Sequence, residues 1–168
     1  MALVVLIGMM GSGKSTVGIA LADLLGVPFM DTDKLLELRL GRRIRQWFQI
    51  YGEQAFREHE TLMLQELDAT EGVLATGGGI VLREENWSEL KRLGIIVYLD
   101  VDPDVLKFRL TNTKRKRPLL EVEDWETRFD DLLEKRKPIY ERADLTVKVK
   151  DEELADVAQK IKEMLIGT

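Results

Sequence analysis

The fold of this chain is constrained most by its eighth to fifteenth residues, Gly8-Met9-Met10-Gly11-Ser12-Gly13-Lys14-Ser15. They match G-x-x-x-x-G-K-[ST] without departure and lie between an uninterrupted apolar run at 3–7 and a stretch of helical spacing at 15–25. In such a loop, successive backbone N–H groups hold phosphate oxygens, and the following helix adds its positive dipole end. Lys14 offers a charge to the β- and γ-phosphates, and the Ser15 hydroxyl is placed for Mg²⁺. The chain is therefore predicted to bind a nucleoside triphosphate rather than to form a ligand-free glycine turn.

The rest of the chain alternates apolar runs with amphipathic stretches, which is typical of an α/β domain with a parallel sheet. Strands are predicted at 3–7, 27–30, 73–75, 95–99 and 145–149. Helices are predicted at 15–25, 34–40, 43–50, 52–67, 87–93, 104–110, 125–137 and 154–165, with Pro138 expected to stop the seventh. The segment 111–117 is polar, basic and predicted to be irregular. With 168 residues and no linkers or repeats, we expect one domain over 1–168.

Composition excludes several kinds of site. The net charge is −5, which argues against a nucleic-acid or anionic-membrane surface. The chain has no cysteine for disulfides or thiolate sites, and its one histidine, His59, is expected to have no chemical role. No apolar run approaches the ~20 residues that span a bilayer, and the apolar start lacks the basic region of a signal peptide. We therefore expect a cytoplasmic protein with neither nucleic acid nor membrane as a partner.

The phosphate-binding loop (8–15) leaves three classes open: a small-molecule kinase, a GTPase switch, and a nucleotide-binding module without catalysis. A GTPase should carry an N-K-x-D motif, and neither Asn86 nor Asn112 begins one. The usual metal-binding Asp at a strand end is missing from 73–79, so Asp31 and Asp33 are the candidates. Both follow the second strand, at the sheet edge where open α/β folds bind ligands. One could face Mg²⁺ and the other an acceptor hydroxyl, or one could simply cap the next helix.

Three later features point to an anionic acceptor. Glu60 falls in phase with apolar residues of its predicted helix, and Arg57 at i−3 can pair with it and present its fork to a planar anion; an ordinary surface ion pair is the alternative. Gly77-Gly78-Gly79 follows a strand, where bare backbone can lie against a ligand or make a tight turn. Arg136 falls in phase with apolar residues, so it should point inward, where an arginine requires an anion.

In this order, the motifs resemble those of the shikimate kinases, within the nucleoside-monophosphate-kinase-like P-loop family. They are the loop at 8–16, Asp31-Thr32-Asp33, Phe56-Arg57 with Glu60, Gly77-Gly78-Gly79, Arg117-Pro118-Leu119-Leu120, and Arg136 ahead of Pro138 and Tyr140. The resemblance implies a three-layer α/β fold with a five-stranded parallel sheet of order 2-3-1-4-5. It also implies a mobile lid near 111–123 and a small helical substrate-binding region near 32–60.

The resemblance further implies a reaction and a role for each matching residue. The reaction is Mg²⁺-dependent transfer of the ATP γ-phosphoryl group to the 3-hydroxyl of shikimate, in the chorismate route to aromatic amino acids. ATP would be held by Gly11, Ser12, Gly13, Lys14, Ser15, Thr16, Arg109 and Arg117. Shikimate would be held by Asp33, Arg57, Gly78, Gly79 and Arg136. Ser15 and Asp31 would hold the metal, Asp33 would act as general base, and Lys14 and Arg117 would supply catalytic charge.

Two alternatives remain beside this reaction, and the chain is expected to be a monomer. Another small-acid kinase, such as a gluconate kinase, would phosphorylate a linear sugar acid. A nucleotide-binding regulator would bind ATP without turnover.

Overall fold

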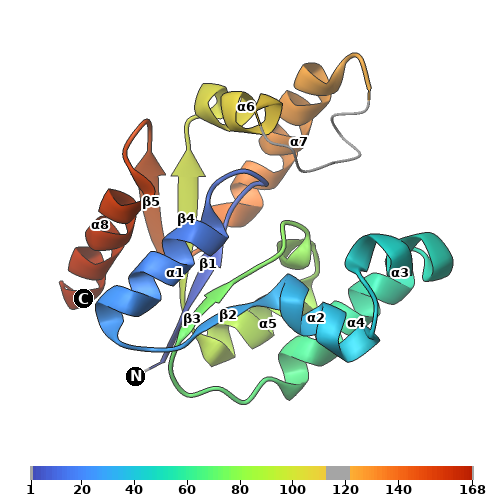
Figure 1. The fold of residues 1–168 in the computed structure, drawn as a ribbon, viewed down its shortest axis with the longest axis horizontal. Coiled ribbons are helices and arrows are strands. Elements are labelled where there is room, and N and C mark those ends of the chain that lie inside the picture. Colours follow the sequence, from blue (N-terminus) through green and yellow to red (C-terminus); the bar gives the residue numbers. More distant parts are fainter. Residues whose placement is uncertain (1, 113–121, 168) are drawn as a thin grey trace.

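The computed structural model describes residues 2–112 and 122–167. Five parallel strands form one sheet in the order β2-β3-β1-β4-β5, as predicted (Figure 1). Their bounds are Leu3–Ile7 for β1, Phe29–Asp31 for β2, Val73–Ala75 for β3, Gly94–Val101 for β4 and Leu145–Val149 for β5. The central strand β1 is buried along its whole length, because helices cover both faces of the sheet.

Eight α-helices and one short 3₁₀ helix, η1, surround the sheet in the described part of the chain. Helices α1 and α8 pack side by side on one face, and α5 lies on the other (Figure 1). Helices α2, α3 and α4 extend beyond the β2 edge. The helix bounds are Lys14–Leu25 (α1), Thr32–Leu40 (α2), Ile44–Tyr51 (α3), Glu53–Glu66 (α4), Ile80–Leu82 (η1), Glu84–Leu93 (α5), Pro103–Thr111 (α6), Trp125–Tyr140 (α7) and Leu154–Ile166 (α8).

The strand register sets the position of the candidate site. Asp31 at the end of β2 lies beside Ala75 of β3, and Ala75 lies beside Leu6 of β1. The segments that follow these three residues therefore leave the sheet at the same edge. They are the phosphate-binding loop, the Asp31-Thr32-Asp33 segment and the Gly77-Gly78-Gly79 segment.

The prediction that Pro138 stops the seventh helix is wrong, because α7 continues to Tyr140. Pro138 lacks one N–H donor, but only two helical residues follow it, and Glu141 N–H still donates to Lys137 O at 3.0 Å. Tyr140 is completely buried, so packing of its ring favours the extra half-turn. As a result, Tyr140 lies one turn beyond Arg136 on the same helix.

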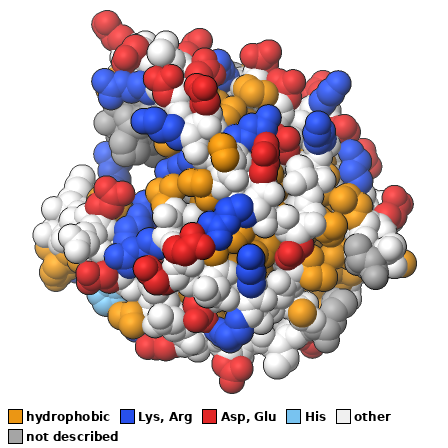
Figure 2. All heavy atoms as spheres, turned by 180° about the vertical axis from the view of Figure 1, so that it is seen from behind, with side chains coloured by type: hydrophobic (Ala, Val, Ile, Leu, Met, Phe, Trp, Pro, Cys, Tyr) orange, Lys and Arg blue, Asp and Glu red, His pale blue; other side chains and the backbone are white. Residues whose placement is uncertain are grey.

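None of the helices within residues 2–112 and 122–167 is long and apolar enough to cross a membrane. On the face seen in Figure 2, basic and acidic side chains are interspersed rather than gathered by sign.

Candidate active site

A cavity of about 1080 Å³ opens at the carboxyl edge of the sheet. It is lined by the phosphate-binding loop, by Asp31 and Asp33, by the β3–η1 loop and by residues around α3. A single cavity therefore holds the residues of the phosphate-binding loop together with Asp31 at the end of β2 and Asp33 at the start of α2. This is the usual ligand position in an open α/β sheet.

The phosphate-binding loop wraps as its glycines predict. Gly11 and Gly13 have φ angles of 80° and 89°, which residues with a Cβ rarely adopt. Lys14 folds back over the loop, and its Nζ donates to Gly8 O at 2.5 Å and to Met9 O at 3.3 Å. Ser12 Oγ is buried and has no hydrogen-bond partner within the described residues. The loop thus places a hydroxyl and an ammonium group around a concavity that fits phosphate oxygens.

Asp31 contributes both to the site and to the cap of α2. Ser15 Oγ donates to Asp31 Oδ2 at 2.9 Å. The other carboxylate oxygen, Oδ1, accepts from the N–H groups of Asp33 and Lys34, so it caps the helix. The capping alternative is therefore confirmed for Asp31, while Oδ2 and the Ser15 hydroxyl form a pair of hard oxygen donors. Such donors suit Mg²⁺, which proteins hold through one or two carboxylates plus substrate phosphates.

The glycine triplet (Gly77, Gly78 and Gly79) lies against three charged side chains and makes room for two of them, Asp33 and Arg57. A Cβ at Gly77 would lie 2.6 Å from Asp33 Oδ1, and one at Gly78 would lie 3.5 Å from Arg136 Nη1. A Cβ at Gly79 would overlap the guanidinium of Arg57. The triplet turns into η1, with Ile80 N–H donating to Gly77 O, but a turn alone does not require all three glycines. Bare backbone here lets α2, α4 and α7 bring their charges to one short segment.

The pair of Arg57 and Glu60 is far from an ordinary surface ion pair. Arg57 Nη1 lies 2.7 Å from Glu60 Oε1, and the Glu60 side chain is only 1% exposed. Burial raises the pKa of Glu60 above its ordinary value, the Arg57 charge opposes that rise, and the negative Asp33 adds to it. Glu53 on the preceding turn lies 3.7 Å from Arg57 Nη2. The guanidinium is thus held by two carboxylates and lies close to Gly79.

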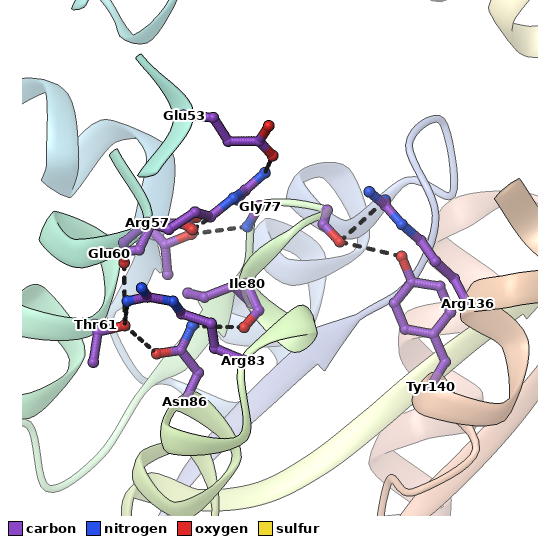
Figure 3. Close-up of polar contacts among 12 residues, drawn as sticks. Glu53, Arg57, Glu60, Thr61, Gly77, Ile80, Arg83, Asn86, Arg136 and Tyr140 are labelled. Carbon is purple, nitrogen blue, oxygen red and sulfur yellow. Dashed lines mark hydrogen bonds and ion pairs between the residues drawn. The ribbon is translucent and has the colours of Figure 1, made fainter. Parts of the chain in front are cut away.

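Arg136 points inward, as its phase in the sequence predicts. Its Nη1 donates to Gly78 O at 3.3 Å, and its buried Nε has no partner within the described residues. Figure 3 shows Arg57 and Arg136 on opposite sides of the loop that carries Gly77. Two guanidinium groups therefore flank the glycine triplet, an arrangement that suits a planar anion such as a carboxylate.

Arg109 lies against the phosphate-binding loop. Its Nη1 donates to Gly11 O at 3.2 Å, and it lies close to Gly13. Arg117, the basic run at 114–117 and most of the predicted lid at 111–123 lie outside the described residues.

Several residues of the site carried no clear signal in the sequence. Thr32 is buried between the two aspartates, and its Oγ1 accepts from Gly77 N–H at 2.8 Å, so it ties α2 to the triplet. Arg43 and Arg45 line the cavity at the start of α3. Thr32 could have been noticed from its position within Asp31-Thr32-Asp33. The two arginines could not, because exposed arginines are common on any helix.

Comparison with known proteins gives the same assignment as these residues. The family model for shikimate kinase matches residues 10–166. Shikimate kinase from Synechococcus sp. (strain RCC307) is 44% identical over 163 residues, which are 96% of this chain and 83% of that protein. The enzyme from Caldanaerobacter subterraneus subsp. tengcongensis is 41% identical over 94% of this chain and 92% of that protein.

The structural likeness extends over the whole chain. A shikimate kinase from Acinetobacter baumannii, solved in complex with shikimate, superposes with a TM-score of 0.91 at 39% identity, covering 99% of this chain and 94% of that one. A crystal structure of shikimate kinase from Bacteroides thetaiotaomicron gives a TM-score of 0.87 at 35% identity, covering 98% of each chain. The phosphate-binding loop, the paired arginines around three glycines and these likenesses agree: the chain belongs to the shikimate kinase family, the ATP-dependent kinases that its motifs resemble.

Proposed function

We propose that this chain transfers the γ-phosphoryl group of ATP to the 3-hydroxyl of shikimate, in the site described above. The hydroxyl oxygen forms the new bond to phosphorus, the bond from phosphorus to the β–γ bridging oxygen breaks, and ADP leaves. The observation that carries this proposal is that one cavity is lined by the phosphate-binding loop, by a carboxylate and by part of the glycine triplet. The triplet in turn lies against two arginines.

On the nucleotide side, the loop amides of Gly11, Ser12 and Gly13 are proposed to hold phosphate oxygens, with Thr16 beside them. Lys14 exchanges its present bonds to Gly8 O and Met9 O for the β- and γ-phosphates. Arg109 donates to Gly11 O in the loop and is proposed to meet the adenine.

Ser15 Oγ and Asp31 Oδ2 are the oxygen donors proposed to hold Mg²⁺. The ion supplies positive charge that offsets the negative charge on the phosphates. The hydrogen bond between these two atoms, at 2.9 Å, keeps both on the same side of the cavity.

On the acceptor side, Arg57 and Arg136 are proposed to bind the shikimate carboxylate, together with the backbone of Gly78 and Gly79. Glu60 and Glu53 hold Arg57 in place, which reduces the side-chain entropy lost on binding. Neutral cyclic polyols lack the carboxylate, so the two arginines give selectivity for an acid.

Asp33 is proposed as the general base. It lies beside Gly77 and lines the cavity together with the phosphate-binding loop. From there it can orient the attacking hydroxyl and accept its proton. Arg117, on the resemblance of its motif, is proposed to add charge at the transferring phosphoryl group.

A coupled assay of ADP release tests the proposal with three acceptor conditions: shikimate, gluconate and none. Shikimate-dependent release is the expected result. Preferential turnover of gluconate would assign the site to a linear sugar acid, and ATP binding without turnover on either acid would make the chain a nucleotide-binding regulator. Because the nucleotide and acceptor residues all come from one chain, we also propose a monomer, which light scattering in solution tests.

A further inference from the structure

The carbonyl oxygen of Gly78 accepts two hydrogen bonds from α7. Tyr140 Oη donates to it at 3.2 Å and Arg136 Nη1 at 3.3 Å, one helical turn apart (Figure 3). The Tyr140 ring is fully buried and stacks on Tyr98, with ring centroids 5.1 Å apart. Its hydroxyl also lies 3.7 Å from Met9 Sδ, in the phosphate-binding loop. The hydroxyl of this buried side chain therefore lies between the phosphate-binding loop and the glycine triplet.

The hydrogen bond to Gly78 O also fixes the direction of the neighbouring N–H group, that of Gly79. The C=O of Gly78 and the N–H of Gly79 belong to one planar trans peptide, so they point in opposite directions. Holding the carbonyl toward α7 therefore directs the Gly79 N–H away from α7. Glycine flanks this peptide on both sides, so side chains offer little resistance to its rotation.

We propose that Tyr140 is a positioning residue of the acceptor site, which keeps the Gly78–Gly79 peptide in the orientation that presents the Gly79 N–H to the acceptor. This inference rests on the proposed binding of shikimate at the glycine triplet. Arg136 holds the same carbonyl, but it is also a proposed ligand of the carboxylate. Tyr140 has no proposed contact with the acceptor, and besides Gly78 O its hydroxyl meets Met9 Sδ and the Arg136 side chain.

The chain contains a matched control for removal of the hydroxyl. Tyr98 is the other ring of the stack and is also buried, but its Oη contacts Asp100 at 3.4 Å and not the triplet. Tyr140→Phe and Tyr98→Phe each delete one phenol oxygen from the same stacked pair. A merely structural role would give similar effects in both variants.

Calorimetric titration of shikimate and, separately, of ADP is the first test. Tyr140→Phe should raise the shikimate Kd about three- to tenfold, the factor that one net hydrogen bond contributes, with the ADP Kd changed less than about twofold. Tyr98→Phe should leave both constants unchanged. Unchanged shikimate affinity in Tyr140→Phe would overturn the proposal, as would an equal loss in Tyr98→Phe or an equal loss of ADP affinity.

The second test needs no ligand and separates this proposal from the proposed function. ¹⁵N relaxation dispersion at the Gly79 amide should reveal exchange in Tyr140→Phe that is absent from the native chain and from Tyr98→Phe. A rigid Gly79 amide in all three proteins would contradict the proposal. Failure of the native chain to bind shikimate would instead refute the acceptor assignment, and the dispersion result would still decide whether Tyr140 holds the peptide.

Discussion

A methyl group added at Gly79 should abolish most of the acceptor affinity while leaving the fold intact. The backbone of Gly79 has φ −95° and ψ −1°, a conformation that residues with a Cβ adopt at position i+2 of type I turns. Its Cβ, however, would overlap Nη1, Nη2 and Cζ of Arg57. The guanidinium is the far end of a flexible side chain, so it can swing away, and the variant should fold.

The size of the expected loss in shikimate affinity follows from the hydrogen bond that a displaced Arg57 no longer makes to the carboxylate. A hydrogen bond to a charged group contributes about 1.5–3 kcal/mol, or roughly 10- to 150-fold in affinity. Gly79→Ala should raise the shikimate Kd by a factor in that range, whereas the ADP Kd should change little because the phosphate-binding loop is not touched. Calorimetric titration of each ligand measures both effects.

Gly78→Ala is the matched control within the same triplet. Its Cβ would lie 3.5 Å from Arg136 Nη1, an ordinary van der Waals contact, so shikimate affinity should fall by less than about threefold. Equal losses in the two variants, or normal shikimate binding by Gly79→Ala, would refute the argument that the triplet exists to admit the Arg57 guanidinium.

Four other substitutions give distinct outcomes. Lys14→Ala should lower kcat by orders of magnitude without unfolding, and near-normal turnover would remove Lys14 from catalysis. Asp33→Asn should keep the melting temperature, because Asp31 caps α2, and should lose most of kcat; an active variant would exclude Asp33 as base. Arg136→Lys should weaken shikimate binding, since an ammonium keeps the charge but lacks the planar fork, and unchanged affinity would place the carboxylate elsewhere. Burial raises the pKa of Glu60 in the folded chain, whereas the unfolded chain releases this proton above a pH of about 4.5. The free energy of unfolding should therefore fall as pH rises from about 4.5 through the raised pKa. Glu60→Gln cannot release that proton, so its free energy of unfolding relative to the native chain should increase as pH rises above 4.5; parallel denaturation profiles would contradict this.

The sheet and the phosphate-binding loop could be predicted because local sequence determines them. The run at 3–7 is too short and too β-branched for a helix, and the glycines of the loop have φ angles that few other residues adopt. Strand order, in contrast, came with the family resemblance, since no local pattern fixes which strands lie side by side.

The predictions that failed or were incomplete depend on tertiary packing. Pro138 signals a helix end, but the buried ring of Tyr140 extends α7 past it. The capping and metal roles of Asp31 looked like alternatives, yet Oδ1 caps α2 while Oδ2 accepts from Ser15 Oγ and stays available for the proposed metal role.

The buried hydrogen bonds near Arg57 also could not be predicted from any local sequence pattern. Behind it, Thr61 Oγ1 donates to Asn86 Oδ1 at 2.8 Å, and Asn86 Nδ2 donates to Ile80 O at 2.7 Å, which joins α4, α5 and η1 (Figure 3). These residues are far apart in the chain, so only the folded structure relates them.

The most direct test of the proposed reaction is ³¹P NMR of the native chain with ATP, Mg²⁺ and shikimate. The account predicts one new phosphomonoester, with its phosphorus coupled to the proton on ring carbon 3, formed in equal amount with ADP. Release of inorganic phosphate in place of the ester, or an ester at another ring carbon, would contradict the proposed alignment of Asp33, the acceptor hydroxyl and the phosphate-binding loop.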